Sequence, residues 1–351
     1  MSDAPVEKPK RRPRYRGTHP RKFHEKYKEL DPERYSADVS KIIASGKTPA
    51  GMHRSILVKE VLEVLAPKPG DIAVDATLGY GGHALELLRA IQPGGRLLAL
   101  DVDPLEIVKS EERLRNSGFP SESLLVRRGN FAGLAKFLAA EDINGADVVL
   151  ADLGLSSMQI DNPERGFTFK RTGPLDLRMN PQRGQPASAL LASLDARRLA
   201  QLLEENADEP YATLLATSLV NVQSRQPIAT TTALATAVTQ ALSTLPGQPS
   251  KEQLDTSVRR VFQALRIAVN DEFSALETFL RNLPACLRTG GRVAILTFHS
   301  GEDRRVKKSF QEGFRSGLYV RIAEEVIRPG SEEIRANPRS SAAKLRWAIR
   351  S

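Results

Sequence analysis

Hydrophobic and polar residues follow two different periods along the chain, and these predict strands and helices in alternation. Four short apolar runs predict buried strands, at Asp71–Asp75, Arg96–Asp101, Ser123–Arg127 and Ala146–Asp152. Apolar residues recurring every three or four positions predict helices around them, at residues 55–65, 83–90, 104–116 and 132–140. Strands that alternate with helices form a parallel sheet covered on both faces. The first part of the chain therefore predicts an α/β fold.

The pattern changes in the middle of the chain and then returns. Residues 156–251 show no convincing strand, and their periodicity predicts helices over 187–205, 210–222 and 230–242. A helix over 261–283, a turn at Gly290–Gly291 and an apolar strand at Arg292–Phe298 follow, and residues 319–327 and 344–349 predict closing edge strands. We predict a helical domain over residues 158–255, inserted into an α/β domain made of residues 46–157 and 256–351.

Most of the positive charge lies at the start of the chain. The net charge is +9, and residues 1–28 alone, with ten Lys or Arg and three Asp or Glu, carry +7. We predict that residues 1–45 form a basic, mostly disordered arm with a short helix near residues 38–44. Aromatic residues interleave with its charges, which fits an RNA-binding tail acting through counterion release. A disordered, solubilising extension explains the same composition equally well.

Composition also limits the compartment and the chemistry. No apolar run approaches the roughly 18 residues that span a membrane, and no apolar segment follows the charged N-terminus as in a secretory signal. We therefore predict a cytoplasmic protein without a membrane partner. The single cysteine, Cys286, lies in an apolar stretch and is predicted to be a small buried core residue. With five histidines and no cysteine cluster, no metal site is predicted.

The segment Asp75–His83 combines a strand end, a glycine turn and a helix start, the place where open α/β sheets bind nucleotides. Asp101 ends the next strand, 22 residues after Gly79, where an acid can accept hydrogen bonds from ribose hydroxyls. Asp103, which precedes a proline, is predicted to cap the following helix instead. The glycines depart from the G-x-G-x-x-G spacing that a pyrophosphate requires, and this favours S-adenosylmethionine over a nicotinamide dinucleotide.

Two other strand ends carry polar residues at the same predicted edge. Asp152 ends the fourth strand, and either a functional role or a loop-stabilising hydrogen bond to Ser156 explains it. His299 and Asp303 follow the later strand and are candidates for contacting an acceptor or orienting a loop. The serines after Asp152 have no base nearby in the sequence, which argues against a serine nucleophile.

Arginine and aromatic residues gather where the helical insertion begins. The residues in question are Arg165, Phe167, Phe169, Arg171 and Arg178. Such a mixture suits stacking on unpaired bases and contact with phosphates. A buried pair of phenylalanines beneath an ordinary charged loop is the alternative.

Taken in order, several segments closely resemble the bacterial small-subunit ribosomal RNA cytosine-N4 methyltransferase family, also called MraW or RsmH. The matching segments are His53–Leu57, Asp75–His83, Asp101–Pro104, Asn130–Phe131, Asp152–Asp161, Arg165–Phe169, Gly173–Met179, Phe262–Ile267, Phe298–Lys307 and Asn337–Arg339. The resemblance covers roughly residues 52–350 and implies a class I methyltransferase fold, Rossmann-like with a mostly parallel sheet. It also implies that the inserted all-helical domain helps to bind RNA.

The resemblance further implies roles for individual residues. Contacts to S-adenosylmethionine would come from Gly81, Gly82, His83, Asp101, Phe131, Asp152 and Gln159. The acceptor would be the exocyclic N4 of a cytidine in the decoding region of small-subunit ribosomal RNA, free or in an assembling subunit. Our candidate hydrogen-bond acceptor for that amine is Asp152 or a neighbouring backbone carbonyl, with His299 as second choice. The sequence leaves the oligomeric state open, a homodimer included.

The chain departs from the family pattern at several points. Gly301 stands where the family usually has Leu, and residues 255–260 and 340–344 differ from the usual motifs. The basic arm before about residue 50 also departs from the pattern of most members of that family. Two rival functions stay open at this point: a nicotinamide-dependent oxidoreductase, and a non-catalytic ribosome-assembly factor that retains a methyl-donor pocket.

Overall fold

The computed structural model describes residues 55–247 and 249–351. The predicted basic arm and the short helix near residues 38–44 lie outside the described residues. Among the helices that are described, none has both the length and the apolar character needed to cross a membrane.

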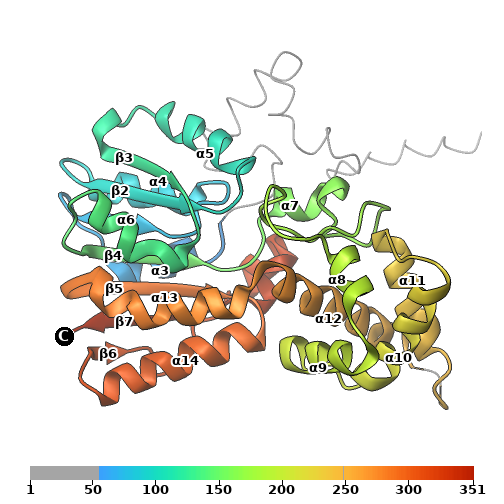
Figure 1. The fold of residues 1–351 in the computed structure, drawn as a ribbon. Coiled ribbons are helices and arrows are strands. Elements are labelled where there is room, and N and C mark those ends of the chain that lie inside the picture. Colours follow the sequence, from blue (N-terminus) through green and yellow to red (C-terminus); the bar gives the residue numbers. More distant parts are fainter. Residues whose placement is uncertain (1–54, 248) are drawn as a thin grey trace, which may run out of the picture. The chain divides into compact units, whose positions relative to one another are not determined.

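A single sheet of seven strands forms the α/β part of the described chain, in the order β3-β2-β1-β4-β5-β7-β6 (Figure 1). The strands are β1 Ile72–Asp75, β2 Arg96–Asp101, β3 Leu124–Arg128, β4 Ala146–Asp152, β5 Leu287–Thr297, β6 Tyr319–Ile322 and β7 Lys344–Arg350. Strands β1 to β5 run parallel, whereas β7 is antiparallel to both β5 and β6. The predicted mostly parallel sheet is confirmed.

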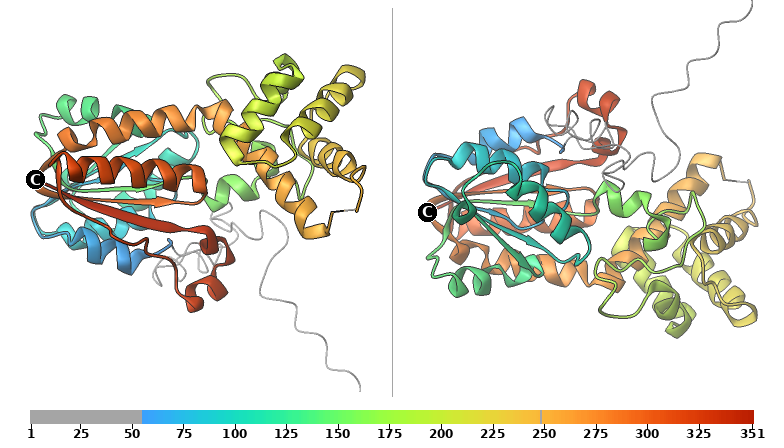
Figure 2. Two further views of the ribbon diagram at one scale, coloured as in Figure 1. Left: turned by 90° about the horizontal axis from the view of Figure 1, so that it is seen from below. Right: turned by 90° about the horizontal axis from the view of Figure 1, so that it is seen from above.

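Helices cover both faces of the sheet, as Figure 2 shows from two further directions. One face packs against α3 Val58–Leu65, α4 Gly82–Ile91 and α5 Glu106–Arg115, and the other against α6 Leu134–Ala140, α13 Glu272–Cys286 and α14 Ser300–Arg315. Alternate residues of β4 enter the two cores: Val149 packs with the α13 side and Val148 with the α4 side. This two-sided burial explains the unbroken apolar runs. Cys286 is buried in the α13 core, as predicted.

The predicted insertion is helical and has a hydrophobic core of its own. Its helices are α7 Ser157–Asp161, α8 Ala187–Ser193, α9 Ala196–Ala207, α10 Ala212–Arg225, α11 Thr231–Leu242 and α12 Lys251–Asn270. The single helix predicted over 187–205 is wrong, because Asp195 accepts a hydrogen bond from the Arg198 N–H and starts a new helix. The domain limits at 158 and 255 stay predictions, and α12 runs through the second of them.

Three further sequence predictions are corrected. The helix predicted over 261–283 is two helices, because α12 begins at a capping box formed by Ser250 and Gln253 and ends where Asp271 takes a φ of 50°. Gly290–Gly291 do not separate helix from strand, since β5 already starts at Leu287 and has an irregular register with β4. The strand predicted over 319–327 ends at Ile322.

Short segments complete the described chain. They are α15 Ser331–Ala336 and the 3₁₀ helices η2 Ser121–Ser123, η3 Phe131–Gly133, η4 Pro163–Arg165 and η5 Pro338–Ala342. The carboxyl ends of β1, β2, β4 and β5 lie at one edge of the sheet because these strands are parallel. The predicted site residues follow those ends.

Candidate functional site

The glycine loop and Asp101 lie in direct contact. Oδ2 of Asp101 accepts a hydrogen bond from the Gly79 N–H at 2.7 Å, and Oδ1 accepts one from the Asp103 N–H at 2.8 Å. Gly81 has a φ of 85°, a backbone conformation that favours glycine, and it precedes the first residue of α4. The structure thus joins the two elements of the predicted nucleotide site at the ends of β1 and β2.

Asp152, at the end of β4, faces the start of α4. Its N–H donates to Oγ1 of Thr77 at 2.6 Å, and its Oδ2 lies 3.6 Å from Nε2 of His83. Its Oδ1 is buried and has no hydrogen-bond partner among the described residues. Ser156 does not bind Asp152: its hydroxyl accepts from the Gln159 N–H and caps α7. The loop-stabilising interpretation of Asp152 is therefore wrong for this serine.

Asp75 joins these residues as a third acid at the same edge. It ends β1, is 1% exposed, and accepts a hydrogen bond from the Thr77 N–H at 3.1 Å. The sequence analysis does not name Asp75 as a site residue, because an acid that follows an apolar run is also expected to cap a helix or a loop. The signal was its position, since Asp75, Asp101 and Asp152 are each the last residue of a neighbouring parallel strand.

Burial and mutual repulsion make these carboxyl groups hard to ionise. Burial raises the pKa of Asp101 to about 6, that of Asp75 to about 7 and that of Asp152 to about 8, and neighbouring acids add to each increase. Burial lowers the pKa of His83 to about 4, so its imidazole is uncharged at neutral pH. None of the three acids forms an ion pair with Lys or Arg in the described part of the chain. A positively charged ligand would stabilise their ionised forms.

Asp103 follows β2 and connects that end of the strand to the helical insertion. Its Oδ1 accepts from the N–H groups of Leu105 at 2.9 Å and Glu106 at 3.4 Å, so Asp103 binds the start of the helix as predicted, but α5 begins at Glu106 with Leu105 at the N-cap position. Its Oδ2 accepts from the Arg165 guanidinium and from the Gln159 side-chain amide, both at 2.7 Å. Arg165 also donates to the carbonyl of Met179 at 2.8 Å. The Gln159 amide is thus held by protein groups, and its contact with a cofactor stays a prediction.

Aromatic residues near the edge pack mainly into the protein. Phe131 follows β3, and its ring meets Phe279 edge-on with 5.3 Å between centroids. Phe167 is buried, and the ring of Phe169 lies 5.3 Å from that of Phe262. The buried interpretation is therefore confirmed for Phe167, whereas Phe169 is only partly buried and the stacking of a base on it stays a prediction.

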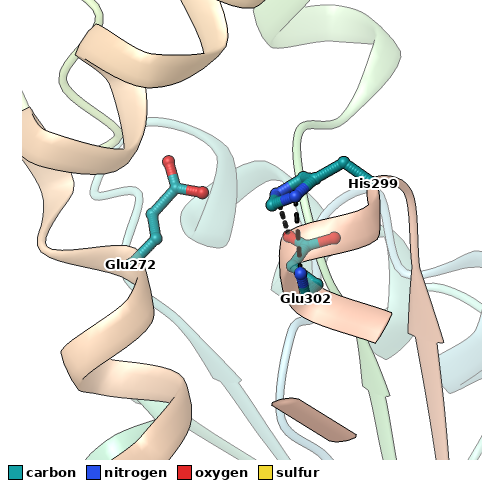
Figure 3. A group of neighbouring side chains, drawn as sticks. All are labelled: Glu272, His299 and Glu302. Atoms are coloured by element: carbon teal, nitrogen blue, oxygen red, sulfur yellow. Dashed lines mark hydrogen bonds and ion pairs between the residues drawn. The ribbon is translucent and has the colours of Figure 1, made fainter. Parts of the chain in front are cut away.

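His299 caps the helix that follows β5. Its Nδ1 accepts a hydrogen bond from the Glu302 N–H at 3.4 Å, and its Nε2 lies 3.2 Å from Oε1 of Glu302 (Figure 3). The other oxygen of Glu302 accepts from the Phe298 N–H at 2.8 Å. The charge of Glu302 also contributes to the raised pKa of Asp152, so the cluster borders the same edge. Because Nδ1 is engaged as an acceptor, the proton of a neutral imidazole resides on Nε2.

Glu272 is the third member of this cluster and faces the imidazole (Figure 3). Ligand atoms of Glu272, His299 and Glu302 lie within 4.8 Å of one another, a spacing also found around metal ions. Both oxygens of Glu272, however, accept hydrogen bonds of 2.8 Å from the Arg266 guanidinium. The guanidinium already supplies the positive charge, so we interpret the cluster as a buried ion-pair network.

Asp303 lies in the same Phe298–Lys307 segment as His299, but its side chain binds residues of the sheet. It forms ion pairs of 2.6 Å with Arg346 and 3.0 Å with Lys344, both on β7. Its carboxylate therefore joins α14 to the antiparallel edge of the sheet, while its N–H donates to the His299 carbonyl at 3.2 Å.

Gly301 is required by the packing around His299. A Cβ at this position would lie 2.6 Å from the ring of Phe273 and 3.2 Å from Nδ1 of His299. We expect Gly301→Leu, the usual family residue, to lower the free energy of unfolding by about 1–3 kcal/mol through overpacking. Urea denaturation would measure the loss, and adding Phe273→Ala should restore part of it. A gain in stability for Gly301→Ala, as at an unconstrained helical glycine, would contradict this account.

Relatives with known names share most of the chain. The ribosomal RNA small subunit methyltransferase H 1 of Lachnoclostridium phytofermentans is 51% identical over 342 residues, covering 97% of this chain and 93% of that protein. The ribosomal RNA small subunit methyltransferase H of Trichlorobacter lovleyi is 40% identical over 312 residues, covering 84% and 97%. A SAM-dependent O-methyltransferase structure from Thermotoga maritima gives a TM-score of 0.39 at 13% identity, covering 90% and 71%.

The alignments with the two relatives differ in how much of the N-terminal arm, residues 1–45, they include. The first alignment covers 97% of this chain, so it includes most of residues 1–45, whereas the second covers 84%. The arm is thus shared with some relatives. The family model described as the MraW methylase family matches residues 50–351. The chain therefore belongs to the MraW methylase family.

Proposed function

We propose that this protein transfers a methyl group from S-adenosylmethionine to the exocyclic N4 of a cytidine in the decoding region of small-subunit ribosomal RNA. The names of its relatives support small-subunit ribosomal RNA as the substrate. The observation that carries the chemistry is Asp152, whose buried Oδ1 has no hydrogen-bond partner within residues 55–247 and 249–351, at the edge where the glycine loop and Asp101 meet.

The residues at the donor side fit S-adenosylmethionine. Asp101 binds two backbone N–H groups and keeps lone pairs for ribose hydroxyls. Gly81, Gly82 and His83 would border the methionine portion, and Phe131 would form part of the wall. When bound, S-adenosylmethionine supplies an activated methyl group on a positively charged sulfur. The three acids of raised pKa favour that charge.

Asp152 would act on the amine of the acceptor. The nitrogen lone pair of cytosine is delocalised into the ring, and a hydrogen bond from the amine to Oδ1 would return electron density to nitrogen. The amine loses one proton for each methyl group that it gains. Asp152 can take up that proton only in its ionised form, which a bound sulfonium would favour. Burial, which raises the pKa of Asp152, makes its carboxylate a stronger base than an exposed one. The base must also turn out of its stack to reach a buried group.

Donor binding is expected to depend on pH. In the empty site, Asp101, Asp75 and Asp152 release their protons between about pH 6 and 8, and only their ionised forms attract a cation. The affinity for S-adenosylmethionine should therefore rise as the pH increases through this window, with proton release on binding. Calorimetry in buffers of different ionisation enthalpy would measure both effects.

S-adenosylhomocysteine is the matched control, because it shares the amino, carboxyl and ribose groups but has a neutral sulfur. Its affinity should change less over the same pH range. Equal pH dependence for the two ligands would show that the carboxylates do not respond to the sulfonium charge.

The function itself is tested with undermodified small subunits from a strain that lacks this protein. The purified full chain and labelled S-adenosylmethionine should produce N4-methylcytidine, and mass mapping of the RNA would locate it. Donor binding without any transfer would favour an assembly factor. Tight nicotinamide binding without donor binding would favour an oxidoreductase.

A further inference from the structure

We infer that Ser110 and Arg113, on α5, are positioning residues that hold the glycine loop of the donor site in its binding conformation. The inference rests on the proposed function, since it concerns the same donor pocket. Neither residue belongs to the motifs that led to the family, and both act through the backbone of the loop.

Ser110 binds Gly79, the first glycine of the loop, through its hydroxyl group. Its side chain is fully buried, and its hydroxyl donates to the carbonyl of Gly79 at 2.5 Å. The N–H of the same glycine donates to Oδ2 of Asp101 at 2.7 Å. Gly79 is therefore held on both sides, by α5 and by the acid that would bind the ribose.

Arg113 fixes the next residue of the loop. Its guanidinium donates to the carbonyl of Tyr80 at 2.9 Å and to Oγ of Ser110 at 2.7 Å. It also lies 3.7 Å from the centre of the Tyr80 ring, a stacking distance. One side chain thus holds both the backbone and the ring of Tyr80.

The contacts follow from helical spacing. Positions three and four residues apart share one face of a helix, so Ser110, Arg113 and Leu114 point the same way. Leu114 lies beside the next glycine, since a Cβ built on Gly81 would be 3.5 Å from its side chain, an ordinary van der Waals distance. This face of α5 therefore binds residues 79 and 80 and lies next to Gly81, and a loop held in advance does not lose conformational freedom when a ligand binds.

The test measures donor affinity apart from catalysis. We expect Ser110→Ala and Arg113→Ala to weaken binding of S-adenosylmethionine and S-adenosylhomocysteine by about fivefold to a hundredfold, the range for a lost buried hydrogen bond. At saturating donor, kcat and the KM for RNA should stay within about threefold of wild type. Arg113→Lys should recover part of the affinity, because it can donate to Tyr80 but cannot stack as a planar group.

Arg115→Ala provides the matched control, because it removes an arginine from the same helix, where Arg115 pairs with Glu111 at the surface. It should leave donor affinity unchanged. Wild-type affinity in the Ser110 and Arg113 variants would overturn the inference. A parallel loss of thermal stability and donor affinity with a rise of the KM for RNA would also overturn it, by showing a general structural role. Donor binding is measured without RNA, so failure of methyl transfer by the wild type refutes the proposed function and not this inference.

Discussion

Replacing Asp152 by Asn should lower kcat for methyl transfer by about 10²–10⁴-fold, the range found when a proton-accepting group is removed. The amide keeps the shape of the side chain, but its oxygen cannot hold the proton that the amine releases. Donor affinity should change far less than kcat, because Asp101 and the glycine loop are untouched. Single-turnover assays together with calorimetry would separate the two quantities.

Asp147→Asn is the matched control for this variant. Asp147 lies on the same strand, near its opposite end, where it binds the Ile72 N–H and Arg288. Methyl transfer by this variant should stay within about twofold of wild type, since no group near the reaction changes. Near-normal kcat for Asp152→Asn would exclude Asp152 as the proton acceptor.

The Asp152→Asn substitution should not destabilise the protein at neutral pH. Folding raises the pKa of Asp152 from its ordinary value of 3.8 to about 8. A carboxyl group whose pKa is raised by folding opposes folding increasingly as the pH climbs from about 4 to 8. Asp152→Asn should therefore melt at the same temperature as wild type near pH 4 and at a higher one near pH 8. A lower melting temperature at pH 8 would contradict the burial argument.

Replacing Arg165 by Met should lower the free energy of unfolding by about 3–5 kcal/mol, because it leaves Asp103 as a buried charge without its partner. The two side chains are 8% and 1% exposed and lie 2.7 Å apart. The variant also removes the donors to the carbonyls of Arg178 and Met179. Urea denaturation followed by circular dichroism would measure the loss.

The pair Arg115–Glu111 tests whether burial causes this effect. Its atoms are also 2.7 Å apart, but the side chains are 41% and 35% exposed. Arg115→Ala should cost no more than about 1 kcal/mol, because water screens exposed pairs. Similar losses for the two arginines would mean that the Asp103 network contributes no more than a surface pair.

The sheet and its order of elements follow from short-range patterns that the sequence displays. Unbroken apolar runs such as Val148–Ala151 mark strands buried on both sides, and the Asp103–Pro104 pair marks a helix start. These features need no knowledge of distant residues. The break before α9 was missed because a helical period continues across Asp195, and only its capping hydrogen bond ends one helix and begins the next.

The candidate site was predictable only in part, because its chemistry depends on residues far apart in the sequence. Asp101, Asp152 and the glycines are visible at predicted strand ends. The raised pKa of Asp152 depends first on its burial and then on the charges of Asp75 and Glu302, and its distance from His83 depends on how β4 meets α4. Likewise, the sequence proposed His299 as an acceptor, but its helix-capping contact with the Glu302 N–H leaves the remaining proton on Nε2.

The pairing of β4 with β5 has a consequence for the order of events during synthesis. Asp152 lies beside Leu296, yet residues 153–286 must be translated before β5 begins to emerge. Until then β4 exposes an unpaired edge, which is prone to wrong associations. The helices in between have a core of their own and can fold during this interval, shortening the effective tether between the two strands. The edge that carries the candidate site is therefore completed late in biogenesis, after most of the polypeptide has left the translating ribosome.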